Sequence, residues 1–340
     1  MKPTVTNADG SDWNAPLFPA LFSCALAALT YSNALECGFV FDDHLAIEGN
    51  QDVVGSTALS GLLGNDFWGK PLVAVDSNKS WRPFAVLSFR LQAQRSRIEE
   101  AGTHSDVKLD AMAFHAANVA LHALVSGGVA LLGAELWGQE RWTVALVSGA
   151  VFAVHPVHVE VLMSRDLISP RASQRAAAVA SLLRRQAVTG VVGRCELLMA
   201  LLCLAASASY RRAVHVCSHS TAGSPSRRLC GTAALRSLAH GTAALLWFVL
   251  ALWSKETAIT LIAVLIVYDH ARLARARVWW RPTSGTLLRG SLLAALGYGY
   301  LWTRMQVMSI GGVSSWESAS LSTSQLARAR KRRAREALPV

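Results

Sequence analysis

The sequence is built around a series of long apolar runs separated by short charged segments. A helix that crosses the roughly 30 Å hydrocarbon layer of a bilayer needs about 20 mostly apolar residues. The residue alternation typical of barrel strands is absent, so helices are the expected spanning structure. The sequence therefore predicts an all-α integral membrane protein. Its expected spans are 17–35, 112–137, 142–159, 195–210, 238–253, 257–269 and 285–303.

The composition agrees with a membrane protein. Hydrophobic residues make up 52% of the chain and charged residues 16%, whereas a soluble domain carries about 25% charged residues. The net charge of +11 is concentrated in short arginine-rich segments. No helix-turn-helix, zinc-finger or RNA-binding motif accompanies that charge, so we predict contact with membrane lipid and no nucleic-acid partner.

The basic segments also predict which side of the membrane each loop faces. Segments 211–236 and 270–281 carry several arginines and no acid, so both are expected in the cytosol, with the turn at 254–256 on the far side. Counting backward places the tail 1–16 in the cytosol and residues 36–111 and 160–194 in the lumen. The charged residues near span ends then meet on the lumenal face. They are Asp42, Asp43, Glu160, Glu196, Lys255 and Glu256.

Seven stretches, taken together in order and spacing, resemble the membrane half of the TMTC family, the transmembrane and tetratricopeptide-repeat protein O-mannosyltransferases. The stretches are FVFDDHLAIEGNQDV at 39–53, DFWG at 66–69, SNKSWRPFAVLSFRLQ at 77–92, FHAANVALHALV at 114–125, VFAVHPVHVE at 151–160, GVVGRCELL at 190–198 and SKETAITLIAVLIVYD at 254–269.

The resemblance implies a GT-C-type multi-spanning helical bundle with lumenal loops, in the membrane of the endoplasmic reticulum. It also implies an enzyme that transfers mannose from dolichyl phosphate mannose to Ser or Thr hydroxyls of secretory-pathway proteins. The donor is a lipid-linked sugar, so no further cofactor and no metal ion is expected.

Three departures from the family pattern shape the expected domain organisation. Excising 161–186 joins HPVHVE to the GVVGR segment, as in the family, so we interpret 161–186 as an insertion within a GT-C-like domain at 17–310. The family's tetratricopeptide repeats and later membrane spans are missing, which indicates a truncated chain whose activity is in question. The basic segment 311–340 is expected to be a disordered tail.

Asp42 and Asp43 are the candidate catalytic pair, because they open the first lumenal loop directly after the first span. A hydroxyl that attacks the anomeric carbon must lose its proton, and a carboxylate serves as general base for that step. The sequence does not choose between the two. We expect partial burial between Phe41 and Leu45 to raise the pKa of one of them. The alternative is an acidic cap that satisfies backbone N–H groups at the start of a loop helix.

The remaining candidates are predicted to bind the donor phosphate or the substrate. The third span ends with His155, His158 and Glu160. Three roles are open for these residues: a metal site, a polar cluster that orients substrate, or a simple cap of the span. Arginine and lysine suit a phosphate. Arg194 and Lys255 can equally form ion pairs with acidic neighbours near the interface, and Arg82 can equally belong to an amphipathic helix that lies on the membrane surface. These residues, with their acidic neighbours, are Arg82, Arg194, Glu196, Lys255 and Glu256.

Two functions from other classes remain open at this stage. A non-catalytic membrane scaffold keeps the fold without turnover. A secondary transporter also uses charges within the membrane, but the charges here gather at span ends and no inverted repeat is visible.

Overall fold

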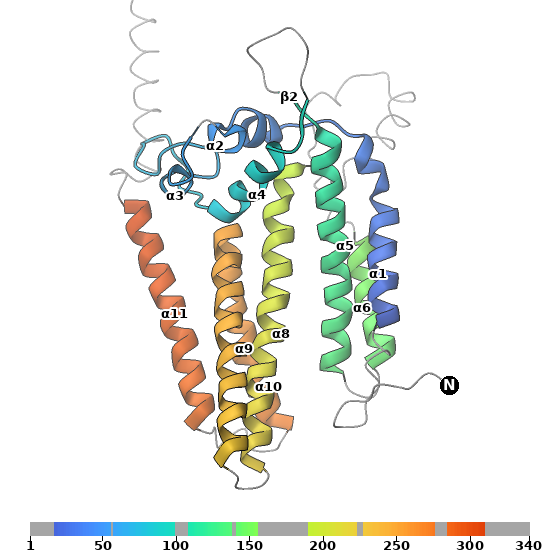
Figure 1. The fold of residues 1–340 in the computed structure, drawn as a ribbon, viewed down its shortest axis with the longest axis vertical. Coiled ribbons are helices and arrows are strands. Elements are labelled where there is room, and N and C mark those ends of the chain that lie inside the picture. Colours follow the sequence, from blue (N-terminus) through green and yellow to red (C-terminus); the bar gives the residue numbers. More distant parts are fainter. Residues whose placement is uncertain are drawn as a thin grey trace, which may run out of the picture. The chain divides into compact units, whose positions relative to one another are not determined.

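The computed structural model describes residues 17–55, 57–98, 108–137, 141–155, 190–222, 227–275 and 284–309. In these ranges the chain is mainly helical, with one short antiparallel ladder that pairs Arg97 with Leu109 (Figure 1). The elements are α1 (Leu17–Thr30), η1 (Ser32–Glu36), η2 (His44–Glu48), α2 (Gln51–Val54), α3 (Gly61–Gly64), α4 (Pro83–Ala93), β1 (Arg97–Ile98), β2 (Lys108–Leu109), α5 (Ala111–Leu136), α6 (Arg141–Val154), η6 (Val191–Gly193), α8 (Arg194–Ala222), α9 (Arg227–Ser254), η7 (Glu256–Thr260), α10 (Leu261–Arg275) and α11 (Ser284–Ser309).

The predicted spans correspond closely to these helices. Among the described residues, four helices are long and apolar enough to cross a membrane, and a shorter apolar helix covers Trp142–Val154. The four are Leu17–Glu36, Ala111–Leu136, Val191–Val216 and Gly231–Ser254. Helices α10 and α11 lie where the sixth and seventh spans are predicted. The chain is therefore a helical, multi-pass membrane protein.

Segment 211–236 differs from its prediction as a cytosolic loop. Helix α8 continues to Ala222 and α9 begins at Arg227, so most of this segment is helical. Arginine and alanine are strong helix formers, and a helix can continue from lipid into water. Charge therefore indicates which side of a membrane a segment faces without indicating where its helix ends.

The described residues divide into two compact units, Met1–Leu62 with Arg82–Leu261 and Leu63–Trp81 with Ile262–Val340. In the second unit α10 and α11 are joined by an ion pair, in which Arg289 Nε lies 3.0 Å from Asp269 Oδ2. Its segment 63–81 is organised around buried Asp66. That carboxylate accepts hydrogen bonds from the N–H groups of Trp68 and Lys70 and from the Ser77 hydroxyl.

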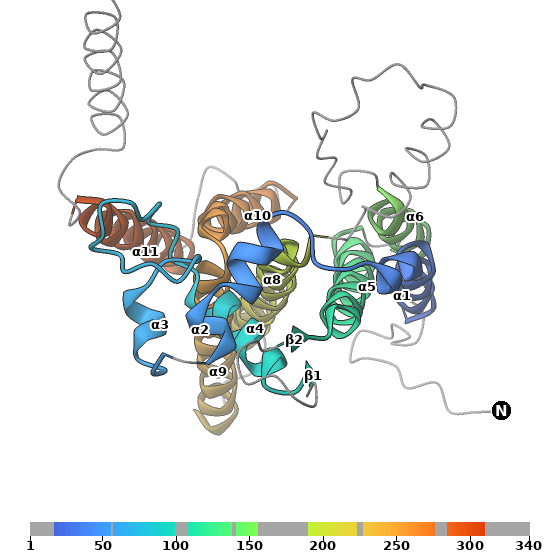
Figure 2. The ribbon, with the colours of Figure 1, turned by 90° about the horizontal axis from the view of Figure 1, so that it is seen from above.

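In the first unit, α1, α5 and α6 pack on one another (Figure 2). Their contacts are made by small side chains. Helices in lipid gain little from hydrophobic burial, so close approach of their backbones supplies the attraction. Gly149 of α6 lies at one such approach, where a Cβ atom would lie 2.7 Å from the Ala130 Cβ. The buried alanines of this core are Ala20, Ala27, Ala123, Ala130, Ala134, Ala145 and Ala153.

Short helices α2 and α4 pack together in the first unit, and α4 also contacts α8 and α9. Buried Arg90 of α4 donates to the carbonyl oxygens of Asp52 and Thr57, at 3.3 and 2.8 Å. Phe89 of α4 is also fully buried. Helix α4 thus rests on protein, which differs from the membrane-surface helix that the sequence allowed.

Candidate functional site

Eight of the ten predicted site residues lie among the described residues, while His158 and Glu160 lie outside them. All eight belong to the first unit. They lie at the end of it where α1, α6 and α9 finish and where α5 and α8 begin (Figure 1). The site residues are Asp42, Asp43, Arg82, His155, Arg194, Glu196, Lys255 and Glu256.

The two adjacent aspartates occupy different environments. Asp42 is exposed, whereas Asp43 is completely buried. Phe41, just before them, has φ 45°, a left-handed conformation that is unusual for a bulky residue and marks a constrained turn. A π-helix over His44–Glu48 follows directly, and such turns recur at functional sites. The fold thus presents one carboxylate to the surface and encloses the other.

Asp43 connects the loop after α1 to the start of α8. Its Oδ1 accepts from the Val192 N–H at 3.0 Å, and its Oδ2 accepts from the Val40 N–H at 3.1 Å. Val192 lies in η6, the turn that leads into α8, where backbone N–H groups lack helical partners. The acidic cap that the sequence left open therefore fits Asp43, although the helix that it caps is distant in sequence.

Burial has the largest influence on the pKa of Asp43 and raises it above the ordinary 3.8. Hydrogen bonds from Val192, Val40 and Val191, and the nearby His115, act in the opposite direction. The expectation that burial raises one pKa is met, but the residues expected to enclose the carboxyl are wrong. Phe41 and Leu45 are 51% and 67% exposed, so they do not enclose the carboxyl.

Arg194 lies inside the protein, 2% exposed. Its Nε donates to Asn118 Oδ1 at 2.9 Å, and its Nη2 donates to the Phe114 carbonyl at 3.1 Å. The guanidinium also lies over the rings of Phe89 and Phe114, at 4.7 and 5.4 Å. Arg194 therefore joins α4, α5 and α8, and its enclosure leaves it poorly placed to meet a ligand directly.

Sequence reasoning missed the polar side chains of α5 that complete this cluster. Asn118 is fully buried and also donates to the Val191 carbonyl at 3.1 Å, while His115 contacts the Gly38 carbonyl at 3.2 Å. Both residues are polar within an apolar span, which is the signal that could have identified them.

The other charged candidates form two ion pairs around the turn between α9 and η7. Arg82 Nε lies 3.2 Å from Glu256 Oε2, and Lys255 pairs with Glu196. Lys255 has extended backbone between the two helices, which confirms the predicted turn at 254–256. The pairs bring together residues from the start of α4, the start of α8 and the end of α9. A phosphate could replace a carboxylate beside either cation.

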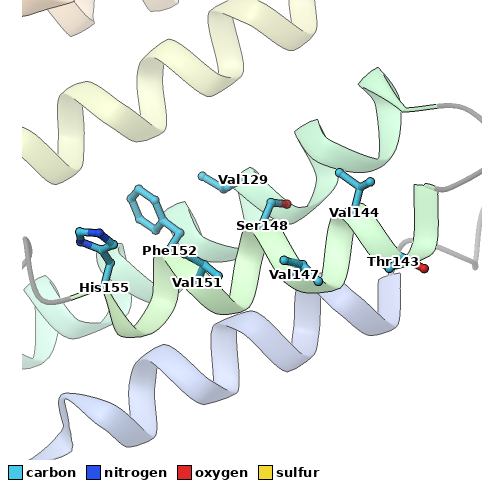
Figure 3. A pocket seen from close by; sticks show the side chains of 8 residues that line it. All are labelled: Val129, Thr143, Val144, Val147, Ser148, Val151, Phe152 and His155. Atoms are coloured by element: carbon cyan, nitrogen blue, oxygen red, sulfur yellow. The ribbon is translucent and has the colours of Figure 1, made fainter.

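His155 lies at the end of α6, beside an apolar cavity of about 640 Å³ (Figure 3). Its carbonyl oxygen accepts from the Tyr31 hydroxyl at 3.4 Å, which ties the ends of α1 and α6 together. In the described ranges, no three His, Cys, Asp or Glu side chains are grouped to hold a metal ion. The cavity is lined by Val129, Thr143, Val144, Val147, Ser148, Val151, Phe152 and His155.

The bundle and its charged end define a multi-pass membrane protein with a polar site where its helices end. Comparison with known proteins finds relatives over part of their length. Protein O-mannosyl-transferase Tmtc1 of Drosophila melanogaster is 38% identical over 188 residues, 55% of this chain and 17% of the relative. Drosophila Tmtc2 is 34% identical over 75% of this chain and 22% of its own length. Human TMTC2 is 31% identical over 85% of this chain and 29% of its own length.

The chain is thus homologous to the TMTC protein O-mannosyltransferases over part of their length. It spans less than a third of each of these relatives. No family model and no solved structure matches the chain.

Proposed function

We propose that the chain is the membrane part of a dolichyl-phosphate-mannose-dependent protein O-mannosyltransferase of GT-C architecture, located in the membrane of the endoplasmic reticulum. The similarity to TMTC enzymes supports the reaction class, and the charged end of the helical bundle supports a site at a membrane surface. Its partners are membrane lipid, the dolichyl phosphate mannose donor and secretory-pathway proteins that carry acceptor hydroxyls. No metal ion is part of the proposal.

The exposure of Asp42 is the observation that carries the proposed mechanism. Its carboxylate removes the proton of a Ser or Thr hydroxyl while the hydroxyl oxygen bonds to the anomeric carbon. The bond between that carbon and the donor phosphate breaks, and dolichyl phosphate leaves with the electron pair. General base catalysis of this kind contributes about 10²–10⁴-fold. Asp43 is a positioning residue, because it holds the Asp42 turn against η6 and has no exposed surface.

The donor phosphate is assigned to the two ion pairs. Arg82 and Lys255 carry the positive charge, and Glu256 and Glu196 hold the two cations in place until a phosphate replaces one carboxylate. His155 stands at the end of α6 and would contact the substrate from that side. Arg194 keeps α4, α5 and α8 together beneath the site.

A non-catalytic scaffold is the second candidate, and one observation favours it. Both cations proposed to bind phosphate already have a carboxylate partner, and Arg194 is enclosed. Such a charge arrangement can also hold helices together without turnover.

Substitution of the individual carboxylates separates the two candidates. The chain is expressed in microsomes, and mannose transfer from labelled dolichyl phosphate mannose to a Ser/Thr acceptor is measured. Asp42→Asn should lower transfer about 100-fold or more while the amount of folded protein stays unchanged. Glu48→Gln, which changes an exposed carboxylate of the same turn, should alter transfer less than about twofold.

Unchanged transfer by Asp42→Asn would remove the proposed base. An absence of transfer by the unaltered chain under the same conditions would favour the scaffold.

A further inference from the structure

A second charged site lies at the other end of the first unit, away from the Asp42 turn. Arg211 follows Arg194 by 17 positions in α8, which corresponds to about 26 Å along a helix at 1.5 Å per residue. That distance is comparable to the hydrocarbon thickness of roughly 30 Å. Arg194 and Arg211 therefore lie near opposite surfaces of the membrane.

Arg211 is a buried cation with unused hydrogen-bond donors. It is 7% exposed, and its Nη2 pairs with Glu135 of α5. Its Nε and Nη1 atoms are buried and have no hydrogen-bond partner among the described residues. A buried unsatisfied donor costs about 1–3 kcal/mol, and more when the group is charged. The guanidinium therefore requires a second acceptor.

The surroundings of Arg211 indicate an anionic ligand. Arg212 is exposed beside it. The neighbouring helix α9 lies at the same level, because the Ser237 hydroxyl donates to the Ala213 carbonyl at 3.0 Å. Exposed Arg236 directly precedes Ser237. Arg211, Arg212 and Arg236 thus lie at one level of the α8–α9 contact, and the acid paired there among the described residues is Glu135.

We propose that Arg211 binds the phosphate of an anionic phospholipid. A phosphate oxygen accepts from Nε or from Nη1, which lie on different edges of the guanidinium, while Glu135 pairs with Nη2 between them. Arg212 and Arg236 add attraction for an acidic headgroup at the bilayer surface. The lipid tails extend into the membrane, which distinguishes this ligand from free phosphate. The site is separate from the proposed mannose transfer and does not depend on it.

Lipid binding by the full chain in detergent tests this site. Retention of phosphatidic acid and phosphatidylcholine is compared by native mass spectrometry, and inorganic phosphate is added as the free-anion competitor. The unaltered chain should retain phosphatidic acid preferentially, and millimolar phosphate should not displace it. Arg211→Gln should weaken retention about tenfold, as loss of a charge-assisted hydrogen-bond pair implies. Arg212→Gln, at the exposed neighbour, should change it less than about threefold.

Two further variants keep the test decisive if Arg211→Gln does not fold. Arg211→Lys keeps the charge without the planar set of donors and should bind phosphatidic acid more weakly than the unaltered chain. Glu135→Gln removes the negative charge beside Arg211, which repels a phosphate, and should bind phosphatidic acid more tightly. Equal retention of phosphatidic acid by the unaltered chain, Arg211→Lys and Glu135→Gln would overturn the proposal, and so would its displacement by millimolar inorganic phosphate.

Discussion

At the scale of single residues, Arg194 shows how a buried charge can hold membrane helices together. Its guanidinium donates hydrogen bonds to Asn118 and to the Phe114 carbonyl and lies over two aromatic rings, so its planar shape matters as well as its charge. We expect Arg194→Lys to destabilise the protein by about 1–3 kcal/mol, since a lysine cannot make both bonds and stack. Thermal unfolding in detergent checks this. Arg212→Lys, exposed on the same helix, is the control and should leave the melting temperature unchanged.

The buried Asp43 carboxyl gives a pH dependence of known sign. Its pKa in the folded protein is raised above the ordinary 3.8, so the folded state binds this proton more tightly than the unfolded state. Stability from this group is greatest below pH 3.8 and falls as the pH rises through the raised pKa. As the pH rises above 3.8, the melting temperature of the unaltered chain should therefore fall relative to that of Asp43→Asn. A difference that stays constant with pH would contradict the burial of an ionisable group there.

At the scale of elements, the contact of α6 with α1 and α5 depends on glycine. A Cβ at Gly149 would overlap Ser23 of α1 and would lie 2.7 Å from the Ala130 Cβ of α5. We expect Gly149→Ala to lower stability by about 1–3 kcal/mol, because α6 cannot move away from α1 and α5 without losing its other contacts with them. Gly241 of α9 has no atom within 4 Å of such a Cβ, so Gly241→Ala should be neutral or stabilise by up to about 1 kcal/mol. Equal melting temperatures for the two variants would contradict this packing.

Elements were more predictable from the sequence than the contacts between them. Apolar length identified the helices, because the bilayer thickness imposes that length. The end of α8 and the start of α9 were missed, because arginine indicates a membrane side and also favours helix. Likewise, the sequence placed Asp42 and Asp43 together at a turn but could not separate their roles. That separation depends on Val192, which is 149 positions from Asp43 and reaches it only in the folded chain.

At the scale of the whole molecule, the charged candidates of the first unit lie at one end of its bundle and Arg211 lies at the other. The proposed enzyme requires the Asp42 end to face the lumen, where dolichyl phosphate mannose presents its sugar. The proposed phospholipid site then faces the cytosol, in agreement with the basic residues around it. Both assignments depend on one orientation of the chain.

Accessibility of the Asp42 turn in sealed microsomes tests that orientation most directly. Leu45 is 67% exposed and lies three positions after Asp42. A membrane-impermeant maleimide should label Leu45→Cys above the background of the native cysteines only after the vesicles are permeabilised. Arg212→Cys, at the opposite end, should be labelled in intact vesicles. Labelling of Leu45→Cys in intact vesicles would place the proposed base in the cytosol and contradict the account.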